Sequence, residues 1–130
     1  MNDYFEAWYQ VLMSASSLEI KGKAEAWGEC HIVTGPRIMY AKVNIAIQPG
    51  EALKISFDLN RDKLALLKEY GWDSQIVFGV LDIMMVSGPY RQFELSIRDV
   101  DIHKVHSVAT AFRIAARNAT KTILADLTSE

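Results

Sequence analysis

The strict alternation of residue types between positions 39 and 47 constrains this chain most, because it requires a sheet. The odd-numbered positions there are all apolar, whereas the even-numbered ones are mostly polar. A two-residue period places the two sets on opposite faces, so we predict a strand with one buried face. Similar alternation predicts further strands over 18–33, 53–57 and 92–98. We expect the first three strands to form an antiparallel meander, with a bend at Gly22 or Gly28 in the first.

Residues 108–127 follow a different period, which predicts a long amphipathic helix. Apolar side chains recur at steps of three and four residues, at Val108, Phe112, Ala115, Ala119, Ile123 and Leu127. The opposite face is predicted to meet water, with Arg113, Arg117, Thr120 and Lys121. The hydroxyl of Ser107 stands where it can cap the first turn, and the small alanines allow the helix to lie close to the sheet.

Three other segments have helical patterns. Residues 3–14 form an amphipathic pattern, and residues 61–69 follow Asn60, whose side chain can cap them. Residues 74–86 can be capped by Asp73 or Ser74, and a Ser-Gly-Pro sequence at 87–89 ends them.

The helix predicted over 74–86 is apolar on nearly every side, although a two-layer domain buries only one side of a helix against its sheet. We expect its other side to be covered by 3–14, by 61–69 or by a second copy of the chain. The interface of such a homodimer would include Phe5, Trp8 or Phe78.

The order of these elements is helix, three strands, two helices, strand and helix, which predicts a single α+β domain over 1–130 with two layers. We expect a cytoplasmic protein, since no signal peptide or membrane-spanning stretch is recognisable and the one cysteine, Cys30, suits a reducing compartment. The net charge of −2 argues against a protein that coats nucleic acid, but it leaves room for a local basic patch.

Two histidines, His103 and His106, lie three residues apart near Asp99 and Asp101. A metal site would need a further ligand fixed at the same point, so we expect no metal and no cofactor. No nucleophile with its base and no pair of carboxylates can be assigned from spacing, so we expect no enzymatic activity. This loop is then either a solvated surface loop or, together with Arg37, a small basic cluster that contacts RNA.

Several motifs occur together in an order that is typical of one protein family. Seven residues match, without a gap, residue types at the end of the fourth domain of translation elongation factor G: His103, Val105, Ser107, Ala111, Phe112, Ile114 and Ala115. Asp99 matches the aspartate that precedes this loop in the family. The Met-Val-Ser-Gly-Pro sequence at 85–89 is similar to the family's Met-Gln-Ser-Gly-Pro, Lys-Glu-Tyr at 68–70 is shared, and Thr-Gly-Pro-Arg-Ile-Met-Tyr at 34–40 resembles Ser-Gly-Gly-Arg-Gly-Gln-Tyr. The chain therefore resembles elongation factor G domain IV over 18–127, and 1–17 would be an N-terminal helical extension.

This resemblance implies both a fold and a partner. The implied fold is a β(3)-α-β-α core with a left-handed crossover, of the ribosomal protein S5 domain 2-like type. The implied partner is the ribosome or a structured RNA, contacted through tip loops 34–38 and 99–107. By the match, Arg37 and His103 would be RNA-binding residues, and Lys104 and His106 would extend the same cluster.

The sequence also departs from the family. Lys104 and His106 replace family aspartates, the glycine-rich first loop is reduced to Gly35, and no P-loop signature for a nucleotide is present. We therefore expect a non-catalytic domain that binds the ribosome or structured RNA. The alternative is a protein-interaction or self-assembly module that has kept the fold without binding RNA. No set of polar residues favours a third class, a small-molecule site between helix and sheet.

Overall fold

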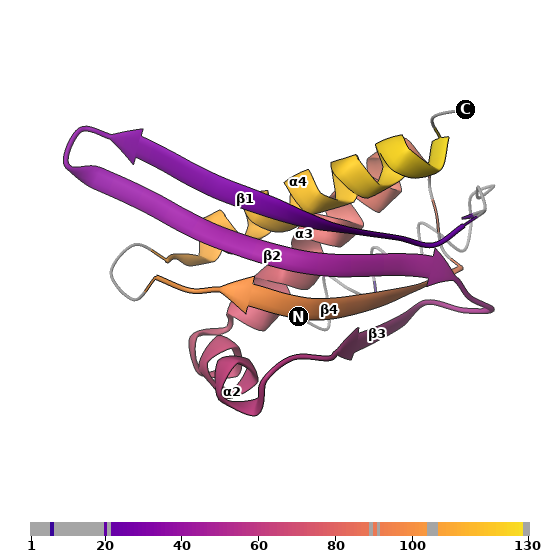
Figure 1. Ribbon diagram of the computed structural model, residues 1–130, viewed down its shortest axis with the longest axis horizontal. Helices are drawn as coiled ribbons and strands as arrows, with labels where there is room; N and C mark the ends of the chain where they lie inside the picture. The colour runs from indigo at the N-terminus through magenta and orange to yellow at the C-terminus, as the bar shows by residue number, and fades with distance from the viewer. Residues whose placement is uncertain are drawn as a thin grey trace.

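The described part of the protein forms a four-stranded sheet with helices packed on one of its faces (Figure 1). The computed structural model describes residues 6, 20, 22–88, 90, 92–103 and 107–128, without the side chains of Thr34, Arg37 and Thr128. The elements are β1 (Ala24–Thr34), β2 (Arg37–Pro49), β3 (Lys54–Phe57), α2 (Arg61–Tyr70), α3 (Trp72–Ser87), β4 (Phe93–Asp101) and α4 (Ala109–Thr128). This arrangement confirms the predicted α+β class with two layers. The helix predicted over 3–14 lies outside the described residues, apart from the exposed Glu6.

The strand order is β1-β2-β4-β3, so the predicted meander is wrong. The third strand does not pair with the second: β4 lies between them, antiparallel to β2 and parallel to β3. The inward side chains of β4, Phe93, Leu95 and Ile97, are at most 1% exposed, which suits a central strand. The four residues of β3 alternate between exposed and half-buried, which suits an edge. A parallel neighbour requires a crossover connection, and α2 and α3 supply it.

The first strand follows its prediction in part. The chain bends at Gly22, as expected, and β1 then pairs with β2 without a register shift through Gly28. The irregularity lies instead between β2 and β4, where Ile45 faces Ile97 and Asn44 faces Asp99. Arg98 is the extra residue of this bulge, so two residues, Arg98 and Asp99, separate the buried Ile97 from the next buried side chain, Val100.

Helix α4 lies very close to the sheet, as its alanines predict. A Cβ atom added at Gly28 of β1 would stand 2.0 Å from the carbonyl oxygen of Ala115 and 2.4 Å from the backbone nitrogen of Ala119. Two predictions for this helix are wrong: Val108 is 41% exposed, whereas Thr120 is fully buried and donates a hydrogen bond to the carbonyl of Ala116. Val108 precedes the first residue of α4, and Thr120 is buried because α4 packs against α3 as well as against the sheet, which makes its buried surface wider than one stripe.

Helix α3 is covered on its second side by α4, a partner that the sequence patterns did not indicate. The two helices approach closely at Gly79, where an added Cβ would stand 2.4 Å from the carbonyl oxygen of Arg113. Helix α3 also begins earlier than predicted, at Trp72, directly after Gly71. Gly71 has a left-handed φ of 71° and joins α2 to α3, so neither Asp73 nor Ser74 stands at the cap position. The cap predicted for α2 is confirmed, because Asn60 accepts hydrogen bonds from the backbone of Asp62 and Lys63.

An ion-pair cluster links α3 to α4 beside this crossing. Asp82 of α3 accepts hydrogen bonds from Arg113 Nε and Nη2, at 2.8 and 2.9 Å, and from Arg117 Nε at 2.9 Å. The side chain of Asp82 is only 16% exposed. The two arginines, which were predicted to face water, are therefore held across the helix interface. Among the described helices, none is both long and apolar enough to cross a membrane.

Candidate nucleic-acid interface

The hairpin formed by β1 and β2 projects beyond the rest of the sheet (Figure 1). Strand β2 pairs with β1 from Arg37 onward, but its pairing with β4 starts only at Lys42. The hairpin residues before Lys42 therefore form an arm without a third strand. Gly35 and Pro36 close the arm, and the φ of 61° at Gly35 followed by proline suits the two-residue turns that join twisted antiparallel strands.

The loop between β4 and α4 lies at the same end of the sheet and is attached to this arm at Tyr40. The hydroxyl of Tyr40 donates a 2.6 Å hydrogen bond to Asp101, and Ser107 Oγ donates a 2.9 Å bond to the backbone carbonyl of Tyr40. Ser107 Oγ also accepts a 2.9 Å bond from the backbone N–H of His103. The hydroxyl predicted to cap α4 thus fixes the loop to the hairpin, and α4 begins two residues later. We call hairpin residues 31–40, together with the loop 102–108 between β4 and α4, the tip.

The tip brings rings from three segments together. The ring of Tyr40 meets His31 edge-on at 5.9 Å between centroids and meets His103 edge-on at 6.3 Å. His31 and His103 are both exposed. The sequence patterns gave neither His31 nor Tyr40 a role, although the register pairs the two residues and so puts their side chains on the same face of the hairpin.

Of the four predicted RNA-binding residues, the structure describes His103 in full and Arg37 by its backbone alone. His103 is exposed beside Tyr40, and the backbone of Arg37 opens β2 opposite Thr34. The side chain of Arg37 and all of Lys104 and His106 lie outside the described part of the chain. Asp101, His103 and Ser107 lie at the same end of the sheet as the β1–β2 hairpin and contact it at Tyr40, whereas a side-by-side arrangement of loops 34–38 and 99–107 stays a prediction. A single basic patch made by the four side chains stays a prediction.

Two carboxylates of this region are already engaged. Lys63 of α2 donates a 2.8 Å hydrogen bond to Asp99 and a 2.9 Å bond to the carbonyl of Val100. The hydrogen bond from Lys63 lowers the pKa of Asp99, although partial burial opposes this effect. Asp101 is bound to the Tyr40 hydroxyl. The ammonium of Lys63 offsets the charge of Asp99, which lessens the repulsion that a phosphate approaching this region would meet.

The hydrogen bond between Tyr40 and Asp101 predicts an unusual alkaline titration. The pKa of Tyr40 is raised to about 12. This bond is the main cause, followed by partial burial and by the negative charges of Asp101 and Glu29. The phenol of an unfolded chain ionises near pH ~10, so the stabilisation is present below that pH and is lost as the pH rises toward about 12. Asp101→Asn should return one phenol to its ordinary range in an ultraviolet titration, whereas Asp58→Asn, away from the tip, should not. Identical titration curves for both variants would contradict the assignment.

No metal centre is found at the tip or elsewhere in the described part of the chain, where no three His, Cys, Asp or Glu residues converge. Cys30 is buried, and that burial, with the charge of Glu29, raises the pKa of its thiol. A buried thiol with a raised pKa is a poor nucleophile, so Cys30 acts as a core residue.

The fold is similar to one found in the crystal structure of ttk003000868, a protein from Thermus thermophilus, with a TM-score of 0.73 and 22% sequence identity. The likeness covers 87% of this chain but 18% of the Thermus chain, so this chain spans less than a fifth of that protein's length. At this identity the likeness establishes the fold alone. No protein-family model and no curated protein sequence matches the chain.

Proposed function

We propose that this protein is a non-catalytic relative of elongation factor G domain IV that binds the ribosome or a structured RNA through the tip. The observation that carries the proposal is the projecting hairpin with the β4–α4 loop attached to it at Tyr40. Of the residues that match the family's tip motif, Ser107 makes this attachment directly, and the backbone N–H of His103 donates to the same Ser107 hydroxyl. Such a protein would act in the cytoplasm.

The path of the crossover supports the ribosomal protein S5 domain 2-like assignment. In Figure 1 the helices lie behind the sheet, β3 and β4 both run toward the left, and β4 lies above β3. A chain that leaves β3, passes behind the sheet and returns as β4 above it turns in the left-handed sense. Parallel strands are connected in the right-handed sense in the great majority of sheets, so this path is a specific mark of the assigned type.

The chemistry of the tip suits contact with RNA. Exposed imidazole rings can stack on unpaired bases, and cationic side chains can neutralise phosphates. His31 and His103 flank Tyr40 on the described surface. In the sequence, Arg37 is three residues before Tyr40, and Lys104 and His106 follow His103. A narrow arm of this kind can enter a groove or loop that a broad surface could not reach.

The test is co-sedimentation with ribosomes and with a structured RNA, at low and moderate salt. Arg37→Ala, His103→Ala and Lys104→Ala should each weaken binding about tenfold or less, because each removes one contact to a charged partner. A lysine or arginine variant that has lost a phosphate contact should also show a salt slope smaller by about one unit. Lys121→Ala, an exposed change on α4, is the matched control and should bind like the wild type. The RNA proposal is contradicted if the wild type does not bind, if its binding does not depend on salt, or if all variants bind equally.

The second candidate is a protein-interaction or self-assembly module, and one observation favours it. Ile32 and Val33, next to the hairpin turn, are 41% and 62% exposed. They lie on β1, an edge strand of the sheet, and exposed apolar edges commonly pair with another chain. Sedimentation velocity discriminates between the two candidates. A wild-type dimer that the Val33→Lys substitution dissociates, in a protein that binds no RNA, would favour the interaction module.

A further inference from the structure

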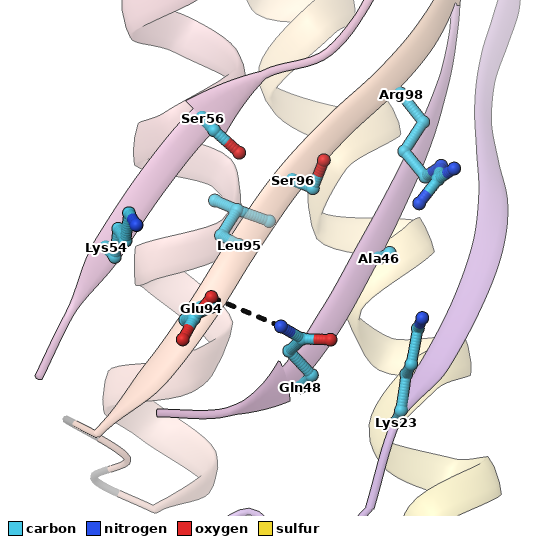
Figure 2. A pocket seen from close by; sticks show the side chains of 9 residues that line it. All are labelled: Lys23, Ala46, Gln48, Lys54, Ser56, Glu94, Leu95, Ser96 and Arg98. Atoms are coloured by element: carbon cyan, nitrogen blue, oxygen red, sulfur yellow. Dashed lines mark hydrogen bonds between the residues drawn. The ribbon is translucent and has the colours of Figure 1, made fainter. Parts of the chain in front are cut away.

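The sheet face opposite to α3 and α4 holds a polar hollow of about 290 Å³ (Figure 2). Its floor is formed where small side chains meet on three neighbouring strands. The register places Ser96 of β4 opposite both Ser56 of β3 and Ala46 of β2. Long side chains stand around this low floor, so the hollow results from the pairing register itself.

Three cations surround the hollow. Lys23 and Arg98 point toward each other on one side, and Lys54 stands on the other (Figure 2). Lys23 and Lys54 make no ion pair or hydrogen bond within the described residues. Arg98 makes only a loose pair with Glu25, at 3.7 Å and with both side chains more than 40% exposed. Arg98 is on this face because it continues the alternation of Glu94 and Ser96 along β4.

The hollow has the opposite charge to the whole chain. Its lining carries three cations and one carboxylate, Glu94, whereas the chain has a net charge of −2. Glu94 is already engaged, since it accepts a 3.2 Å hydrogen bond from Gln48 at the edge of the hollow (Figure 2). The hydroxyls of Ser56 and Ser96 face the hollow and have no hydrogen-bond partner among the described residues. Free donors and surplus positive charge around one cavity select an anion.

An exposed aromatic ring is connected to this site. With its amide oriented to satisfy both neighbours, Asn44 donates to Glu25 at 2.9 Å and accepts from the indole nitrogen of Trp27 at 3.0 Å. Glu25 in turn pairs with Arg98 at the hollow. Trp27 is 44% exposed on the same sheet face, and the Lys42 ammonium lies 5.2 Å from its ring centroid. An anion site with an aromatic ring nearby suits a ligand that combines a phosphate with a planar base.

We propose that the hollow is a binding site for the phosphate group of a nucleotide, free or within an RNA strand. Arg98 contacts two phosphate oxygens through its planar guanidinium, Lys23 and Lys54 supply charge from either side, and the two serine hydroxyls donate from the floor. The site lies on the sheet face opposite to α3 and α4 and includes no residue of the tip, so it goes beyond the proposed function and can be tested separately.

The experiment is titration of the ¹⁵N-labelled protein with inorganic phosphate, adenosine monophosphate and an unstructured oligouridylate, followed by amide chemical shifts. Saturable shifts centred on Ser56 and Ser96 are expected. Lys23→Ala and Lys54→Ala should each weaken the binding that these shifts report by about fivefold to tenfold, because each removes one charged contact. Lys121→Ala on α4 is the control of equal charge change and should bind like the wild type. Binding of the monophosphate would identify a free-nucleotide site, and binding of the oligonucleotide alone would identify an RNA-backbone site.

The proposal is overturned if none of the three probes shifts Ser56 and Ser96, or if all variants bind equally while circular dichroism shows them folded. Oligonucleotide binding that is lost in Arg37→Ala and His103→Ala but retained in Lys54→Ala would overturn this site and support the tip. The reverse pattern would support this site and overturn the tip as the RNA contact.

Discussion

Gly28→Val should lower the free energy of unfolding by about 3 kcal/mol or more, because the new side chain has no space between β1 and α4. Even a single Cβ at this position would stand 2.0 Å from one backbone atom of α4 and 2.4 Å from another. Backbone atoms cannot rotate away as a side chain does, so the helix must move off the sheet. That movement would open the contact with Ala115 and Ala119, both fully buried. Urea denaturation followed by circular dichroism measures the change.

The matched control is Gly22→Ala, at the bend before β1. A Cβ there would stand 3.1 Å from Cδ2 of Leu127, the end of a flexible side chain that can give way. We expect the control to change the free energy of unfolding by less than about 1 kcal/mol. If Gly28→Val were as mild as the control, α4 could not lie as close to β1 as described.

Removing the carboxylate of Asp82 is expected to have the second-largest effect. Asp82→Ala would leave the guanidinium groups of Arg113 and Arg117 without their shared acceptor at the α3–α4 interface. Removing one partner of a buried ion pair costs about 3–5 kcal/mol. Both arginines reach solvent here, however, with side chains 29% and 42% exposed. We therefore expect a loss of about 2 kcal/mol in the free energy of unfolding. Thermal and urea denaturation measure it.

A double-mutant cycle separates the ion pair from other effects of the substitution. Asp82→Ala, Arg113→Ala and the double variant should give a coupling energy of about 1 kcal/mol or more, since hydrogen bonds to charged groups exceed neutral ones. Glu69→Ala on α2 is the control, because this exposed carboxylate should change stability by less than about 0.5 kcal/mol. Additive effects of Asp82→Ala and Arg113→Ala would mean that the pair contributes no stability of its own.

Part of the candidate interface was predictable from the sequence. The motif around His103 indicated a loop of interest, and the alternation of β1 placed His31 on an outward face. The attachment of that loop at Tyr40 was not predictable, because residues 67 positions apart meet only after β2 and β4 have paired. The hollow was missed for the same reason: Lys23, Lys54 and Arg98 come from three separate segments, and only the strand order and the pairing register bring them together.

The sequence by itself determined the local elements of this protein. Two-residue alternation fixed the strands and their buried faces, the apolar periodicity of 108–127 fixed α4 to within a few residues, and the Asn60 side chain fixed the start of α2. These signals are local, because each depends on neighbours within a few residues. The tertiary structure decided which strand lies next to which, so that β4 entered between β2 and β3 although chain order suggested a meander. It also decided the surroundings of each helix. Thr120 and Asp82 became buried because α3 and α4 pack together, and the pattern of a single helix records how apolar its faces are but not which partner covers them.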